Sequence, residues 1–169
     1  MKLILALALA AGAAAVLATE PANYAGSWTL DAAHSTGLPD YYSRVKSHKL
    51  QIAQTPARLQ VDVTVDAGQP EPDRINFVYG LDGVETVTAT PIRGPGGLMQ
   101  VPTKLKATVG VNGTVRIVIT RTIAMGGPPM DAVTTEDWTL SEDHKTLTVH
   151  RVDDTPRGRV DAQMVFVRS

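Results

Sequence analysis

Alternation of apolar and polar side chains constrains the fold of this chain more than any other feature. Between residues 59 and 66 every odd position carries leucine or valine, and every even position carries Gln, Asp or Thr. A similar period of two recurs around residues 104–111, 114–123 and 160–166. Because successive side chains of a β-strand point to opposite faces, each segment predicts a strand with one buried and one solvated face. The pattern predicts antiparallel sheet and is not typical of helix.

Turn-forming residues divide the chain into about ten expected strands. They lie near residues 24–30, 44–54, 57–66, 74–80, 84–90, 98–110, 113–123, 132–140, 145–153 and 158–168. Asn112-Gly113 and Asp82-Gly83 favour two-residue hairpins, and Ser141–His144 links the next pair. Longer loops are expected over residues 68–73, 91–97, 126–129 and 153–158. The even spacing predicts an all-β antiparallel meander of about 8–10 strands closed into a barrel, with a β-sandwich as the alternative.

Residues 31–43 form the one long segment of the expected domain without strand character. Gly37 and Pro39 would break a helix there. An ordered connector is the preferred interpretation, and a lid in which Tyr41-Tyr42 packs over one end of the barrel is the alternative.

The first 18 residues have the pattern of a cleaved secretory signal. Lys2 precedes an unbroken apolar run from Leu3 to Leu17. The run is shorter than the roughly 20 residues that span a bilayer as a helix. We therefore expect an exported protein, periplasmic or secreted, whose mature chain begins near Thr19 and forms one β-barrel domain over residues 19–169. A retained N-terminal anchor is the alternative, and no stable membrane insertion is expected after cleavage.

Cysteine usage and charge exclude several classes of protein. The chain has no cysteine, which excludes a disulfide framework, thiolate metal sites and a cysteine nucleophile. Its formal net charge of −1 gives no electrostatic case for nucleic acid or for an anionic membrane surface. About 150 mature residues suffice for a single hydrophobic core. The sequence does not set the oligomeric state.

The segment Tyr24–Asp31 contains Gly26-Ser27-Trp28, followed by Thr-Leu-Asp. It resembles the Gly-x-Trp signature of lipocalins. It is also similar to the opening of uncharacterised bacterial exported proteins described as lipocalin-like, which often continue with a hairpin like Asp137–Val149. The resemblance implies a calycin-like barrel in which Gly26, Trp28 and Trp138 have structural roles and Trp28 closes one end.

The same resemblance implies that an arginine of a late strand packs across Trp28. Arg121 is the candidate, since it lies in an apolar row of alternate residues, from Val115 to Ile123. Such an arginine gains a cation–π contact and keeps its donors for nearby carbonyls.

Arg121, Glu136 and Arg151 fall on strand faces that the alternation predicts to be buried. One interpretation is a ligand site inside the barrel, where the cluster fixes the polar head of a small molecule whose body lies against valine and isoleucine. A second is a structural ion pair of Glu136 with Arg121 or Arg151, because a buried carboxylate is costly unless paired. A third is exposure of all three side chains at the barrel rim.

No pattern in the chain predicts a catalytic or metal-binding residue. The histidines lack metal-ligand spacing, no serine lies in a nucleophile elbow, and Asp153-Asp154 falls in an expected solvated loop. No cofactor is expected, and we expect that the chain is not an enzyme.

Three functions remain, in order of preference. The first is a module that binds a small hydrophobic molecule inside the barrel. The second is a structural or protein-interaction domain with a filled core and no ligand. The third is an enzyme that uses Glu136 or His150 for acid–base chemistry.

Overall fold

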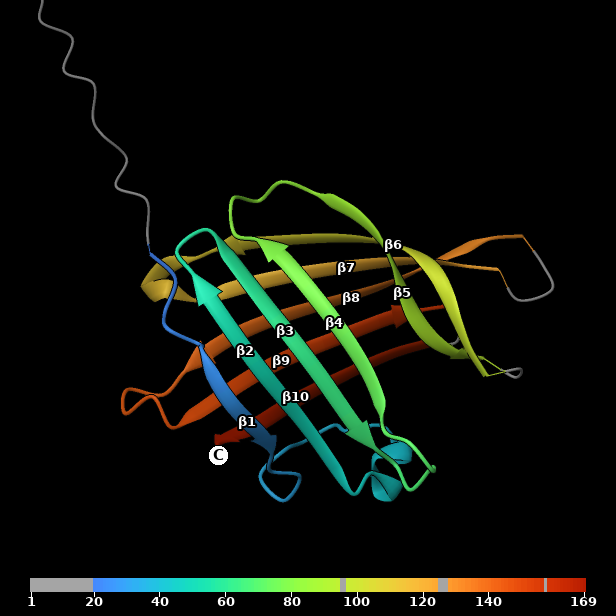
Figure 1. The fold of residues 1–169 in the computed structure, drawn as a ribbon, viewed down its shortest axis with the longest axis horizontal. Coiled ribbons are helices and arrows are strands. Elements are labelled where there is room, and N and C mark those ends of the chain that lie inside the picture. The colour runs from blue at the N-terminus through green and yellow to red at the C-terminus, as the bar shows by residue number, and fades with distance from the viewer. Residues whose placement is uncertain (1–19, 95–96, 125–127, 157) are drawn as a thin grey trace, which may run out of the picture.

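The computed structural model describes residues 20–94, 97–124, 128–156 and 158–169, so the expected signal at residues 1–18 lies outside it. The described residues form ten strands and two short 3-10 helices (Figure 1). The strands are β1 (Gly26–Leu30), β2 (Ser47–Thr55), β3 (Arg58–Asp66), β4 (Asp73–Gly80), β5 (Thr86–Gly94), β6 (Gly97–Val109), β7 (Val115–Ile123), β8 (Met130–Leu140), β9 (Thr146–Thr155) and β10 (Gly158–Arg168). The expected strands differ from these mainly at their ends.

All ten strands belong to one antiparallel sheet in the order β4-β3-β2-β1-β10-β9-β8-β7-β6-β5. The sheet curls so that β2, β3 and β4 cross in front of β6 to β9, which makes a nearly closed barrel (Figure 1). The predicted all-β, antiparallel, lipocalin-like barrel is therefore confirmed in preference to a sandwich. The two edge strands, β4 and β5, face each other at a seam without a described ladder between them.

Asp82-Gly83 lies at this seam, and the predicted hairpin there is wrong. The Gly83 N–H donates to the carbonyl oxygen of Ala107 at 2.9 Å, and Asp82 forms an isolated bridge with Thr108. The loop therefore bonds to β6 instead of turning β4 back onto β5. Gly83 has a positive φ of 77°, and this conformation belongs to the loop that connects β4 to β5 across the seam.

Asn112-Gly113 forms the tight turn that its sequence predicts. Both residues have positive φ, 58° and 73°, and the Thr114 N–H donates to the Val111 carbonyl at 3.3 Å. This is the backbone geometry that a two-residue turn requires and that asparagine and glycine tolerate.

Two expected loops are strands for part of their length. β5 runs to Gly94 and β9 runs to Thr155, so residues 91–94 and 153–155 belong to the sheet. Pro91 is tolerated because β5 is an edge strand, where a missing N–H breaks few ladder bonds. Much of the expected loop at 126–129 lies outside the described residues.

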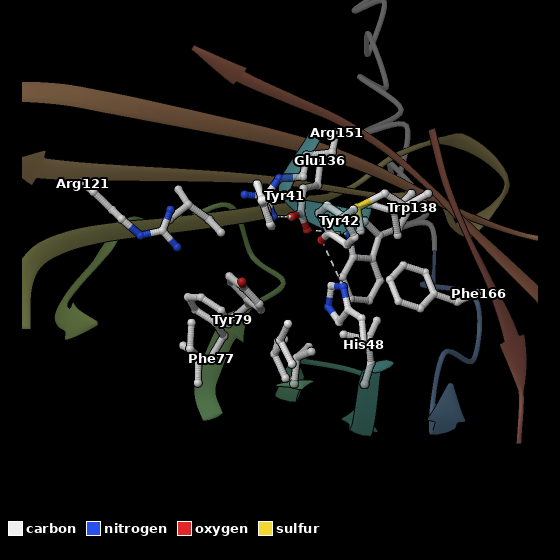
Figure 2. Close-up of a pocket in the computed structure, with 18 residues that line it drawn as sticks. Tyr41, Tyr42, His48, Phe77, Tyr79, Arg121, Glu136, Trp138, Arg151 and Phe166 are labelled. Atoms are coloured by element: carbon white, nitrogen blue, oxygen red, sulfur yellow. Dashed lines mark hydrogen bonds and ion pairs between the residues drawn. The ribbon is translucent and has the colours of Figure 1, made fainter. Parts of the chain in front are cut away.

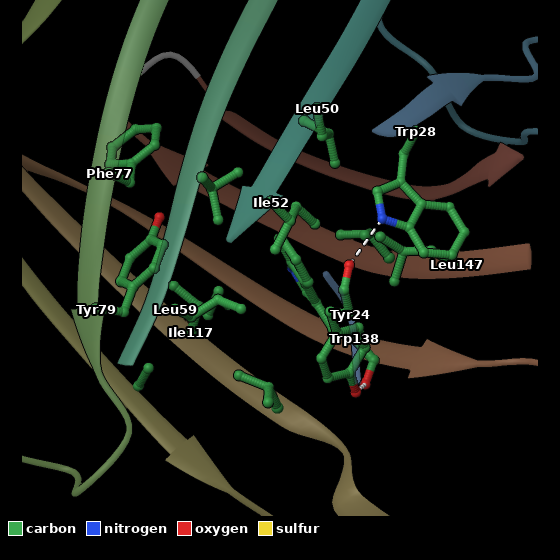
Figure 3. Close-up of a cluster of buried hydrophobic side chains, with 14 of the residues drawn as sticks. Tyr24, Trp28, Leu50, Ile52, Leu59, Phe77, Tyr79, Ile117, Trp138 and Leu147 are labelled. Atoms are coloured by element: carbon green, nitrogen blue, oxygen red, sulfur yellow. Dashed lines mark hydrogen bonds between the residues drawn. The ribbon is translucent and has the colours of Figure 1, made fainter. Parts of the chain in front are cut away.

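The alternating rows face the barrel interior as predicted. Val61, Ile117 and Met164 are 2%, 0% and 3% exposed, although they come from three different strands. Figure 3 shows side chains from opposite walls meeting in this core. Each fully buried aliphatic side chain contributes about 1.5–3 kcal/mol relative to exposure in water.

β1 is held in place by a buried tryptophan and a terminal arginine. Trp28 is fully buried, and its indole N–H donates to the Tyr24 carbonyl at 2.9 Å (Figure 3). The Arg168 guanidinium lies 4.3 Å from the Trp28 ring centre. It also donates to the carbonyls of Ala25 at 2.7 Å and His144 at 2.9 Å. Gly26 is needed here, because its φ is 135° and a Cβ would collide with Arg168.

The resemblance predicted an arginine across Trp28, but the assignment to Arg121 is wrong. Trp28 pairs directly with Arg168 in the β1–β10 register. Arg121 lies on β7, and three strands separate β7 from β1 in the sheet. Its guanidinium instead lies 5.9 Å from the Phe77 ring centre.

We predict that Arg168→Met lowers the free energy of unfolding by about 1–2 kcal/mol, because it removes the cation–π contact and two hydrogen bonds that hold β1. Urea unfolding followed by circular dichroism measures the change. Arg159→Met is the matched control on the same strand. Its side chain is 63% exposed, and its substitution should change stability by less than about 0.5 kcal/mol. Equal effects of the two substitutions would contradict the proposed role of Arg168.

Candidate functional site

The barrel interior contains a cavity of about 200 Å³ (Figure 2). Its apolar lining includes Leu50, Val63, Phe77, Ile119, Met164 and Phe166, and its polar lining includes Tyr42, His48, Tyr79, Arg121, Glu136 and Arg151. These side chains come from strands on all sides of the barrel. The cavity therefore exists only because the sheet curls into a barrel, and no single segment of the chain forms it.

The connector between β1 and β2 contributes part of the cavity wall. Its 3-10 helix, Asp40–Arg44, presents Tyr41 and Tyr42 to the cavity. The Tyr42 hydroxyl lies 3.1 Å from Nδ1 of His48. Earlier in the connector, Thr36 exchanges two backbone hydrogen bonds of 2.9 Å with Gln163. The segment is therefore an ordered connector, and its tyrosines also pack over the cavity as the lid interpretation expected.

Arg151 holds two carboxylates inside the barrel. Its Nε and one terminal nitrogen donate to the two oxygens of Asp153 at 2.8 and 2.9 Å, and the other terminal nitrogen donates to Glu136 at 3.1 Å. Trp138 donates its indole N–H to the second oxygen of Glu136 at 2.9 Å. The Glu136 side chain is 11% exposed, so this is the interior ion pair that the second interpretation described.

Asp153 was expected in a solvated loop, and this is wrong. β9 continues through it, so that its side chain points inward while that of Asp154 points to solvent. Burial acts to raise the pKa of Asp153, but the hydrogen bonds and positive charge of Arg151, together with the hydrogen bond from Thr134, outweigh burial and lower it. Arg151 is likewise penalised by burial, yet Glu136 and Asp153 raise its pKa, so the pair remains ionised.

Arg121 lies beside this cluster without joining it. Its Nε is buried and has no hydrogen-bond partner, and no described residue forms an ion pair with it. Burial, followed by the charge of Arg151, lowers the Arg121 pKa from its ordinary value. Guanidinium remains charged in proteins all the same. Arg121 thus brings a positive charge and unused donors to the cavity wall.

A second pocket, the vestibule, adjoins the cavity at the seam. Its volume is about 340 Å³, and the two seam strands line it through Asp73, Arg74 and Ile75 of β4 and Pro91 and Ile92 of β5. Ile75, Arg121 and Arg151 line both the vestibule and the cavity. The arginines therefore lie where the two spaces meet.

The three predicted ligand-binding residues, Arg121, Glu136 and Arg151, all line the cavity. Trp138 lines it too, so its side chain contributes to the pocket as well as to packing. Trp28 and Gly26 lie at the β1 contact with Arg168.

Phe77 and Tyr79 were not singled out from the sequence. They are stacked, with ring centres 5.7 Å apart, on the inner face of β4. The alternation over residues 75–79 places both inside, but only closure of the barrel brings them opposite Arg121.

The third hypothesis named Glu136 or His150 for acid–base chemistry, and the structure places these two side chains on different surfaces of the barrel. Glu136 is buried in the barrel, whereas His150 is exposed and lies 2.8 Å from Asp161 on the outer surface. The two side chains lie on opposite faces of the sheet, one inside the barrel and one outside it.

Comparison with protein-family models and with curated protein sequences finds no match for this chain. In the part of the chain that the structure describes, no helix has the length and apolar character needed to cross a membrane.

We predict that the free energy of unfolding depends on His48 between about pH 6.5 and pH 4. Burial, followed by the charge of Arg151, lowers the pKa of His48 to about 4. Between these pH values the unfolded chain binds a proton at His48 that the folded chain does not bind. The free energy of unfolding therefore decreases as the pH is lowered from 6.5 to 4. The expected loss is about 3 kcal/mol, from about 1.4 kcal/mol per pKa unit.

Urea unfolding at a series of pH values measures this dependence. His48→Gln should flatten the profile over the same range, since glutamine does not titrate. His150→Gln, at the exposed position on the barrel exterior, should leave the loss in place. An unchanged profile for His48→Gln would contradict the assignment.

Proposed function

We propose that this chain is an exported, lipocalin-like binding module that holds a small, largely apolar molecule inside its barrel. The observation that carries the proposal is the internal cavity of about 200 Å³, with both apolar walls and a polar cluster. A dry cavity of about 150 Å³ accommodates benzene in a well-studied case. The space therefore suits a ligand with a single ring or a short chain.

The vestibule supports a route to this cavity. It lies between the two strands of the seam, where no described ladder closes the wall. A molecule passing between β4 and β5 would meet Ile75 and Arg121, which line both spaces. Within the described ranges, no inter-strand ladder joins β4 to β5.

The alternative is a structural or protein-interaction domain that needs no ligand. The cavity is smaller than the roughly 300–1,000 Å³ typical of ligand pockets. In addition, one end of the barrel is filled by side chains such as Trp28, Leu59 and Leu147, each 0% exposed. Measurement of ligand binding separates the two functions.

We predict that 1-hexanol binds the cavity and that Val63→Phe weakens its binding at least tenfold, because the added ring occupies cavity space. Trp138 lines the cavity, so tryptophan fluorescence reports the titration. Val118→Phe is the matched control, since Val118 lies on β7 between the inward-facing Ile117 and Ile119 and therefore faces outward.

Native mass spectrometry of protein purified from its source compartment provides an independent measurement. The proposal expects a co-purifying small molecule, and the protein mass should correspond to a chain beginning near Thr19. Clean apoprotein together with no binding of 1-hexanol would favour the interaction domain. If wild type and Val63→Phe bound 1-hexanol with equal affinity, the binding site would have to lie outside the cavity.

A further inference from the structure

Arg121 is charged and largely buried, and it forms no hydrogen bond or ion pair with the residues that the structure describes. Its neighbour Arg151 is not comparable, because three of its donors already contact Glu136 and Asp153. Arg121 has no such partner among the described residues, and its Nε is shielded from water. A buried donor without an acceptor costs about 1–3 kcal/mol, and more when it is charged. An acceptor supplied by a ligand would remove this cost.

The Tyr79 hydroxyl is a second unused donor on the same cavity. Tyr79 is 3% exposed, lines the cavity and forms no hydrogen bond with the described residues. Its ring is stacked on that of Phe77, and Phe77 lies beneath the Arg121 guanidinium. Figure 2 shows the side chains of Arg121, Phe77 and Tyr79 grouped at one side of the cavity. Burial raises the pKa of Tyr79 well above its ordinary value, so the hydroxyl keeps its proton.

From this pair of unused donors we propose that the ligand carries a carboxylate, bound by the Arg121 guanidinium and the Tyr79 hydroxyl. The inference rests on the proposed binding function and names the chemical class of its ligand. The carboxylate lies where the cavity meets the vestibule, since Arg121 lines both. The apolar body lies against Val63, Phe77 and Ile119. With a cavity of about 200 Å³, the ligand is a monocarboxylic acid with a short chain or one ring.

The geometry of guanidinium favours a carboxylate over a neutral acceptor. Its planar fork donates two parallel hydrogen bonds to the two oxygens of a carboxylate, and these bonds are about twice as strong as neutral ones. Glu136 and Asp153 moderate the effect, because their negative charges act on Arg121 as well. We therefore expect a preference for carboxylate of about tenfold, which corresponds to about 1.4 kcal/mol.

Binding of three probes tests the proposal: hexanoate, hexanamide and 1-hexanol, titrated at pH 7 and followed by tryptophan fluorescence. Wild type should bind hexanoate at least tenfold more tightly than 1-hexanol, with hexanamide between them. Arg121→Met should lose at least tenfold in affinity for hexanoate and retain its affinity for 1-hexanol. Tyr79→Phe should lose about threefold to tenfold for hexanoate alone, because one hydrogen bond is removed.

Arg116→Met is the matched control for charge. Arg116 lies on the same strand, but its side chain is 61% exposed and pairs with Asp137 outside the barrel. This substitution should leave all three affinities unchanged. Arg121→Lys keeps the charge without the fork and should give an intermediate preference. Circular dichroism and urea unfolding verify folding, and should Arg121→Met fail to fold, Arg121→Lys and Tyr79→Phe decide the result.

The outcomes separate this inference from the function on which it rests. Equal affinity of wild type for hexanoate and 1-hexanol would overturn the carboxylate assignment and leave the cavity as a ligand site. If Arg121→Met lost affinity for hexanoate and for 1-hexanol to the same extent, the carboxylate assignment would be overturned as well. Failure of all three probes to bind wild type would overturn the binding function itself.

Discussion

Closure of the barrel depends on β1, a strand of only five residues. β1 pairs with β2 on one side and β10 on the other, while β4 and β5 meet at the seam without a described ladder. This strand is therefore the hydrogen-bonded link between the β2–β4 layer and the remaining strands. Trp28 and Arg168 fasten it by burial, a cation–π contact and hydrogen bonds to carbonyls. Without β1 the hydrogen-bonded sheet would divide into β2–β4 and β5–β10, so the barrel depends on this short strand.

The barrel interior has a tightly packed apolar part and a part that contains the cavity and its charged side chains. Near β1 the space is filled by large apolar side chains, and farther along the barrel the cavity is bordered by arginines and carboxylates. Charges inside a protein cost free energy unless they are paired and hydrogen-bonded. Arg151, Glu136 and Asp153 meet that condition, whereas Arg121 has no such partner in the described part of the chain. This difference between the two arginines is the basis of the proposed carboxylate site.

Local pattern predicted the strands, their inner faces and the inward position of Arg121, Glu136 and Arg151. It did not predict the partners of these side chains. Asp153 seemed to belong to a loop because polar residues cluster from 153 to 158, but pairing with β10 extends the strand through it. Arg168 was overlooked because a charged residue next to the end of the chain carries no periodic signal. Its position over Trp28 follows from the β1–β10 register.

The sequence by itself determined that the described chain forms an antiparallel sheet with one apolar, buried face and one polar, solvent-exposed face. A period of two is a local property of each strand. Only the tertiary structure decided where the edge strands meet, which arginine covers Trp28 and which side chains share the cavity. Those features join residues on different strands, such as Phe77 of β4 and Arg121 of β7. Their proximity follows from sheet curvature and closure, which alternation along one strand does not encode.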